Sequence, residues 1–166
     1  MQTKKLLLTL FEYKAWANQD LFRLLATVTT DTHAREVHDA IRILNHIHVV
    51  DQIFAANLQS LPHGFTALNT PDTPALDDLH QRVSKTDQWL LDYLGKQPEA
   101  SFAEEIHFTF VDGKPGNMSR GEMLLHVATH GNYHRGAVGR ILSQIDVDPP
   151  WDLMTVYLHQ TPRSAT

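Results

Sequence analysis

The sequence contains no cysteine among its 166 residues. This absence excludes disulfide bonds, thiolate metal ligands, a cysteine nucleophile and redox chemistry on the chain's own side chains. Glycine and proline are scarce, with eight of each, and the apolar content of 42% is ordinary, which excludes a collagen-like or low-complexity chain. A globular chain of this length buries about two-thirds of its unfolded surface, enough for a core without metal or disulfide support. We therefore expect one domain over residues 1–166, in which any metal is functional.

Positive charge is in the minority, with 14 Lys and Arg against 19 Asp and Glu and a formal net charge of −5. This is the wrong sign for a protein that neutralises the phosphates of a duplex, so we expect no nucleic-acid partner. Long apolar runs are also missing. The apolar stretch that follows Lys4 and Lys5 is interrupted at Glu12, far short of a signal-peptide core or a membrane span. We expect a cytoplasmic protein without membrane association.

Apolar residues recurring at steps of three, four and seven predict four long helices. The predicted helices run from Thr3 to about Val28, from the polar break at residues 29–32 to Leu61, from Pro74 to Leu94, and from Arg120 to Ile145. Pro74 follows a capping residue and suits the first position of a helix. Ser119 and Glu122 match the capping box that opens the last long helix. One or two further turns are expected between Trp151 and His159.

One segment favours extended structure. Residues 106–111 alternate β-branched and aromatic side chains and run into the turn-rich sequence 112–116, which predicts a short hairpin before the last long helix. The fold class expected is therefore all-α, a four-helix bundle with a small hairpin. The tryptophans Trp16, Trp89 and Trp151 are too scattered for a base-stacking platform, and we expect them in the core.

Histidine is abundant, with 11 among the 166 residues. His126, His130 and His134 lie four residues apart in the last long helix, and because each such step rotates the direction by only about 40°, all three share one face. Two histidines at this spacing chelate zinc in H-E-x-x-H enzymes, although the glutamate of that motif is absent here. His126 lies about 12 Å of rise from His134, so it is expected next to the ion, facing substrate or extending the surface, rather than as a ligand.

The second predicted helix can supply a third ligand. His46 and His48 point about 200° apart, so at most one of them faces the same ion, and His46 is the better candidate because Leu44 and Ile47 flank it. Three neutral imidazoles leave a fourth coordination position for water or substrate, which is typical of a catalytic site. Asp51 or Glu122 could orient a ligand imidazole, but each could equally be a cap or a surface pair. The remaining histidines are expected outside the site: His33, His38, His63, His80, His107 and His159.

Three segments of the sequence resemble motifs of the DinB family. Residues 13–18 are similar to its Y-x-x-W-A-N segment and residues 44–47 to its L-x-H-I segment. Residues 126–136 resemble its most specific motif, H-x-x-x-H-x-x-x-H-R-G-Q, except that Ala137 replaces the final Gln. Phe54 stands where many members have Trp. The resemblance covers nearly the whole chain and implies an up-down-down-up bundle that often forms homodimers.

The resemblance implies a metal site at His46, His130 and His134, usually with zinc or nickel. Some relatives are thiol-dependent S-transferases or isomerases that use low-molecular-weight thiols, and others look like metal hydrolases. We therefore expect a metal-dependent hydrolase or S-transferase acting on a small molecule, with His126, Tyr133 and Arg135 as candidate substrate contacts. For Arg135 a structural ion pair is an equal expectation. The alternative is a non-catalytic stress-response protein that binds a metal or small molecule.

Overall fold

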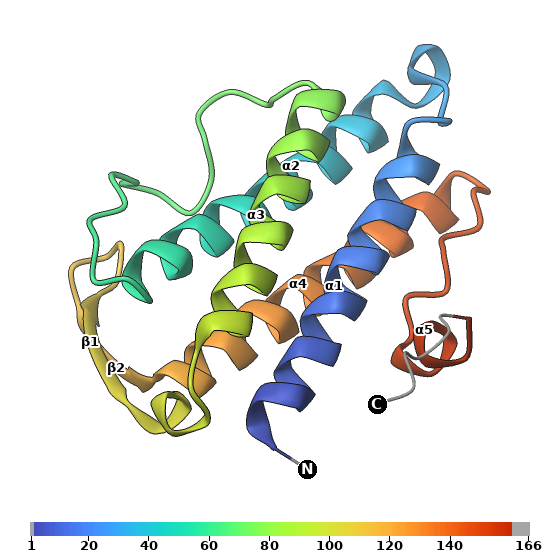
Figure 1. Cartoon of the computed structure of the whole chain (residues 1–166). Coiled ribbons are helices and arrows are strands. Elements are labelled where there is room, and N and C mark those ends of the chain that lie inside the picture. Colours follow the sequence, from blue (N-terminus) through green and yellow to red (C-terminus); the bar gives the residue numbers. More distant parts are fainter. Residues whose placement is uncertain (1, 161–166) are drawn as a thin grey trace.

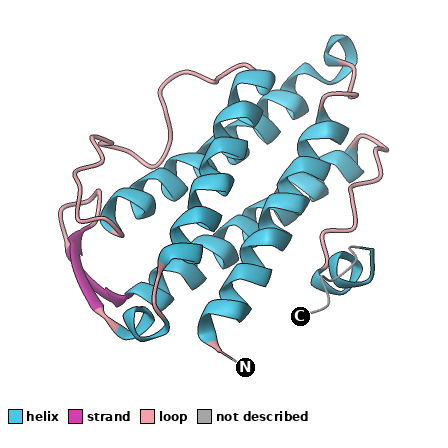
Figure 2. Cartoon of the chain, in the orientation of Figure 1, coloured by secondary structure: helices cyan, strands magenta, loops and turns pink. Residues whose placement is uncertain are grey.

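Four long helices and a small hairpin form the molecule, as a computed structural model that describes residues 2–160 shows (Figures 1 and 2). The elements are α1 (Thr3–Leu25), α2 (Thr30–Asn57), α3 (Leu76–Lys96), the 3-10 helix η1 (Glu99–Ala103), β1 (Glu105–Thr109), β2 (Pro115–Ser119), α4 (Arg120–Gln144) and α5 (Met154–Gln160). Helices α1 and α4 run one way and α2 and α3 the other, because the loop of residues 58–75 returns the chain along the bundle (Figure 1). The up-down-down-up bundle is confirmed. No helix among residues 2–160 is long and apolar enough to cross a membrane.

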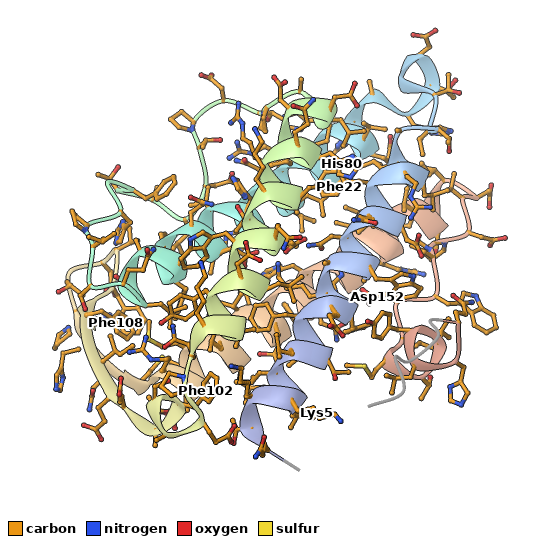
Figure 3. The ribbon with its side chains drawn as sticks, in the orientation of Figure 1. Lys5, Phe22, His80, Phe102, Phe108 and Asp152 are labelled. Carbon is orange, nitrogen blue, oxygen red and sulfur yellow. The ribbon has the colours of Figure 1, made fainter. Side chains whose placement is uncertain are left out.

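The two largest apolar clusters of the core are separated by a buried polar layer, and a third, smaller cluster joins α1 to α5 around Tyr13 and Tyr157. One cluster, around Phe11, Leu90 and Met123, lies toward the hairpin, and the other, around Phe22 and Leu79, lies toward the opposite end. Between them, five polar side chains are at most 5% exposed: Lys14, Asn18, Asp51, Asp87 and Arg135. Helix α1 packs mainly against α3, and α2 mainly against α4. Figure 3 shows side chains filling the space between the helices, with His80 stacked on Phe22 at a ring separation of 4.8 Å.

The hairpin and the capping box form where the sequence predicts them. Strands β1 and β2 pair antiparallel, with Ile106 opposite Met118. A Cβ at Gly116 would lie 2.6 Å from the Phe108 ring, so a side chain there would collide with that ring. At the start of α4, the Ser119 hydroxyl accepts from the Glu122 amide, and the Glu122 carboxylate accepts from the Ser119 amide at 2.7 Å.

Several predicted boundaries were wrong. Helix α3 begins at Leu76 rather than Pro74, because the Arg42 guanidinium donates to the carbonyls of Thr70 and Asp72 and holds that segment as loop. Helix α1 ends at Leu25, three residues early, and η1 was not predicted.

The prediction that all three tryptophans lie in the core was also wrong. Trp16 and Trp89 are only partly buried, and Trp151 is 74% exposed. Trp151 lies in an irregular segment between α4 and α5.

Candidate metal centre

Helices α2 and α4 bring three imidazoles together. His46 comes from α2, and His130 and His134 come from successive turns of α4. One ring nitrogen from each lies within 4.8 Å of the others. The Nε2 atoms of His46 and His130 are 3.1 Å apart. The ring centroid of His134 lies 4.6 Å from that of His46 and 4.4 Å from that of His130. These three residues are close enough to bind one metal ion.

The loop between α2 and α3 fixes the tautomer of His46. Its Nδ1 lies 2.7 Å from the backbone carbonyl oxygen of Leu68. A carbonyl only accepts hydrogen bonds, so Nδ1 carries the proton and donates, and Nε2 keeps a lone pair directed toward His130. This outer hydrogen bond is the device by which proteins orient metal-ligating histidines.

The local electrostatics favour the neutral form of His130 and His134, which is the form that binds metal ions. Burial, with further contributions from the neighbouring rings of His134 and His46, lowers the pKa of His130 to about 3. Burial, followed by the proximity of His46, also lowers the pKa of His134. Protonating any of these rings would place positive charge beside its neighbours in a partly desolvated site.

The cluster contains a buried ring nitrogen that has no hydrogen-bond partner in the part of the chain the structure describes, and a bound cation would explain this arrangement. Within the described residues, His130 Nδ1 is buried and has no hydrogen-bond partner. If His130 donates from Nε2 to His46, this buried Nδ1 is an unsatisfied acceptor; if Nε2 is unprotonated, two lone pairs face each other at 3.1 Å. A cation bound by both lone pairs would remove that repulsion. Neutral nitrogen donors suit zinc, nickel and related divalent ions.

The other candidate residues surround the cluster without joining it. His126 packs on Phe54 at 4.6 Å and on His130 at 5.4 Å, and burial lowers its pKa. Tyr133 is 76% exposed, and its ring meets that of His134 edge-on at 5.1 Å. His48 lies on another side of α2 and borders a cavity between α2 and α3. The structure therefore brings His46, not His48, to the two ligand candidates on α4.

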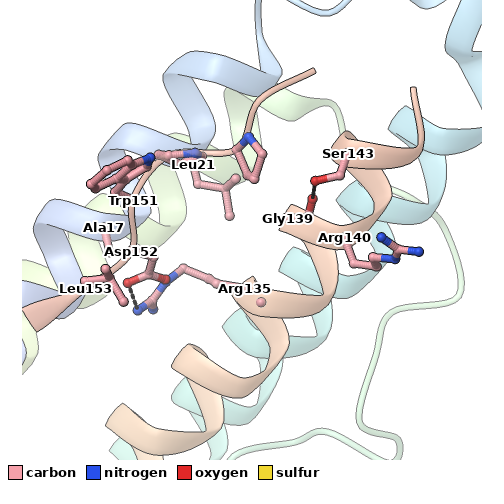
Figure 4. Close-up of a pocket in the computed structure, with 12 residues that line it drawn as sticks. Ala17, Leu21, Arg135, Gly139, Arg140, Ser143, Trp151, Asp152 and Leu153 are labelled. Carbon is pink, nitrogen blue, oxygen red and sulfur yellow. Dashed lines mark hydrogen bonds and ion pairs between the residues drawn. The ribbon is translucent and has the colours of Figure 1, made fainter. Parts of the chain in front are cut away.

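Arg135 does not face the histidines, contrary to its suggested role as a substrate contact. Its guanidinium is buried and donates through Nε to Asp152 at 2.7 Å and through Nη1 to Asn18 at 3.3 Å. Figure 4 shows this ion pair beside a cavity of about 600 Å³ between α1, α4 and residues 149–153. The position of Arg135 agrees with the alternative expectation, that it forms a structural ion pair.

Neither acidic residue considered as an imidazole partner has that role. Asp51 is buried and bonds Lys14 at 2.7 Å, and Glu122 caps α4. Burial raises the pKa of Asp51 to about 6, although the ammonium of Lys14 opposes the shift. Lys14 also contacts Asp87 at 2.6 Å, and the two carboxylates raise its pKa although burial alone would lower it.

The residues that pack against α4 next to the three histidines were not identified from the sequence. A Cβ on Gly131, next to His130, would lie 3.2 Å from Arg135 Nη1 and 3.5 Å from Lys14 Cε, so Gly131 lets the buried polar layer approach α4 closely. A signal was present: Lys14 and Asn18 lie on the apolar face of the first helix, at steps of three or four from Phe11 and Leu21. No periodic pattern in the sequence pointed to the hydrogen bond of the Leu68 carbonyl, because that residue lies in a loop.

Comparison with known proteins shows similarity over most of the chain. The model of the DinB family matches residues 1–165. The chain is also similar to protein DinB of Bacillus subtilis (strain 168), with 25% identity over 150 residues, which cover 81% of this chain and 83% of that protein.

Proposed function

Because this chain belongs to the DinB family, and because three imidazoles converge between α2 and α4, we propose that it is a metal-dependent enzyme. The observation that supports the proposal most strongly is the clustering of three ring nitrogens within 4.8 Å. His46, His130 and His134 would hold a zinc or nickel ion. A divalent ion with three imidazole ligands supplies a Lewis acid that lowers the pKa of a water or thiol in its open position.

The surrounding side chains have distinct proposed roles. The Leu68 carbonyl orients His46 by accepting from its Nδ1. His126 and the exposed Tyr133 lie beside the ligands and offer an imidazole nitrogen and a phenol hydroxyl to a substrate. Among the described residues, no carboxylate hydrogen-bonds to the three ligand imidazoles, so no acidic residue is assigned as general base.

The reaction proposed is hydrolysis or transfer to a low-molecular-weight thiol, with a small molecule as the other substrate. Such thiols are kept reduced in the cytoplasm, which is the proposed compartment. The chain has no cysteine of its own, so any thiol must come from a second molecule. A test compares hydrolysis of p-nitrophenyl acetate with the glutathione-dependent conversion of 1-chloro-2,4-dinitrobenzene. Turnover that requires both metal and glutathione identifies a transferase, whereas thiol-independent ester hydrolysis identifies a hydrolase.

Metal analysis tests the site itself. We expect purified protein to bind about one zinc or nickel ion per chain, as three-histidine sites do. His46→Ala, His130→Ala and His134→Ala should each abolish stoichiometric binding, whereas His126→Ala and the distant His80→Ala should retain it. Stoichiometric metal in His130→Ala would refute the ligand assignment. Bound metal without turnover in either assay would favour the non-catalytic, stress-response alternative.

The proposal includes a homodimer. Apolar surface that such an interface could bury is present near the carboxyl-terminal helix, where Trp151 is 74% and Leu153 is 52% exposed. Sedimentation velocity should show a dimer that Trp151→Ser weakens. A monomer at micromolar concentration would contradict this part of the proposal.

A further inference from the structure

A second cavity, of about 520 Å³, lies between α2 and α3. Its volume falls in the range of roughly 300–1,000 Å³ that is usual for small-molecule sites. Three of the α2 residues that line it, His48, Gln52 and Ala55, point about 180–240° from His46 around the helix. The cavity is therefore separate from the metal centre.

Positive charge lines this cavity without an acidic partner. Arg82 and Lys85 lie on neighbouring positions of α3, three residues apart, and both border the cavity. Within residues 2–160, neither side chain takes part in a hydrogen bond or a salt bridge, and no Asp or Glu lines the cavity. The chain as a whole carries a net charge of −5, so this local positive charge opposes the overall balance. Such a concentration of one sign in a cleft attracts an anion.

The cavity beside α1 and α4 differs in this respect. Its buried guanidinium, Arg135, is already paired with Asp152 at 2.7 Å, whereas Arg140 borders the cavity from an exposed position (Figure 4). An anion entering that cavity would find its buried cation neutralised. The cavity between α2 and α3 leaves its two cations available.

The rest of the second cavity provides fixed apolar and polar walls. The Trp89 ring is partly buried and stacks on Tyr93 at 5.1 Å with an interplanar angle of 23°, which orients the indole. Gln52 donates from Nε2 to Thr86 Oγ1 at 2.7 Å and joins α2 to α3 at the cavity. Ala55, with its small side chain, also lines the cavity. These contacts hold a flat apolar surface next to the two cations.

From this arrangement we propose that the cavity between α2 and α3 binds a small organic oxyanion with a planar apolar body. The body packs against Trp89, and the carboxylate or phosphate lies between Arg82 and Lys85. The guanidinium presents paired N–H donors to two oxygens, and the ammonium adds a second charge. Carboxylates and phosphates share this chemistry.

The experiment is an NMR titration of ¹⁵N-labelled protein with benzoate, phenyl phosphate and the uncharged benzyl alcohol. The Trp89 indole resonance reports occupancy, assigned with Trp89→Phe. We expect at least one oxyanion to bind more than about tenfold tighter than benzyl alcohol, because only the anion forms hydrogen bonds in which both partners are charged. The tighter of benzoate and phenyl phosphate identifies the oxyanion class.

Two double variants locate the binding. Arg82→Gln/Lys85→Gln should weaken oxyanion binding at least about tenfold. Lys5→Gln/Lys96→Gln removes the same net charge from exposed positions outside the cavity and should change the affinity by less than about twofold. Both pairs are exposed, and thermal melts will verify that the variants fold.

Because an oxyanion can also ligate a metal ion, the titration is repeated on His134→Ala with chelator present. Retained binding in that variant supports the separate site even if the metal proposal fails. The inference is overturned by equal affinity for benzyl alcohol, by unchanged affinity in Arg82→Gln/Lys85→Gln, or by no shift of the Trp89 resonance up to about 10 mM ligand.

Discussion

Replacing the buried Lys14 with methionine should destabilise the protein severely. The lysine is 1% exposed, and its Nζ lies 2.7 Å from Asp51 and 2.6 Å from Asp87. Lys14→Met keeps most of the side-chain volume but leaves two carboxylates buried without their cation. Breaking a buried ion pair in this way costs about 3–5 kcal/mol. For a chain of this size the melting temperature should fall by roughly 6–20 °C.

The loss of stability in Lys14→Met should increase as the pH rises. Burial raises the pKa of Asp51 to about 6, and removing Lys14 should raise it further. The protonated carboxyl needs no cation, so Lys14→Met should be more destabilising at pH 8 than at pH 5, as measured by urea unfolding with chelator present. Lys5→Met, an exposed lysine on the same helix, is the matched control. A stability loss equal to that of Lys5→Met, or one that does not grow with pH, would refute the role assigned to the ion pairs of Lys14 with Asp51 and Asp87.

Three further perturbations test separate features. Ser119→Ala removes the hydroxyl that caps α4 and should lower the free energy of unfolding by about 1 kcal/mol, measured by urea denaturation. Gly116→Val places atoms against the Phe108 ring and should cost about 1–3 kcal/mol in the same assay, whereas an unchanged value would contradict the packing of the hairpin. Burial, then Lys14 and Arg82, lowers the pKa of His48 to about 4. Its contribution to stability is therefore present above the unfolded value of 6.5 and lost as pH falls toward 4, so His48→Gln should flatten this part of the pH profile.

Much of the fold could be predicted because it is local. Apolar periodicity identified the four long helices, and the Ser119 capping box located the start of α4 to the residue. The start of α3 could not be predicted in the same way. Pro74 suits a helix start, but Arg42, more than thirty residues earlier on α2, holds the preceding segment as loop. At the start of α3, the tertiary hydrogen bonds of Arg42 outweigh the local preference of Pro74 for the first position of a helix.

In the candidate site, too, the features that depend on local sequence could be predicted, and those that depend on tertiary packing could not. The spacing of His130 and His134 lies within one helix, so their shared face followed from the sequence. That His46 rather than His48 meets them depends on how α2 packs on α4, for which the flanking apolar residues were only a partial guide and the DinB resemblance gave the independent indication. The direction of Arg135 was left open, because its partner Asp152 lies in an irregular segment beyond the end of α4.

The buried polar layer and the candidate metal ligands occupy different sides of the same stretch of α4. Arg135 adjoins His134 in sequence, and its pair with Asp152, together with the contact to Asn18, restrains the rotation of α4 about its axis. Since rotation of the helix moves both imidazoles on α4 relative to His46, this restraint should preorganise the site. Arg135→Met leaves all three ligands in place, yet should weaken zinc binding about tenfold in competition with a chromogenic chelator, the effect expected of a residue that acts behind the ligands. Arg140→Met, at an exposed arginine on the same helix, should leave the affinity unchanged. Equal affinities in the two variants would mean that the ion pair stabilises the fold without positioning the ligands.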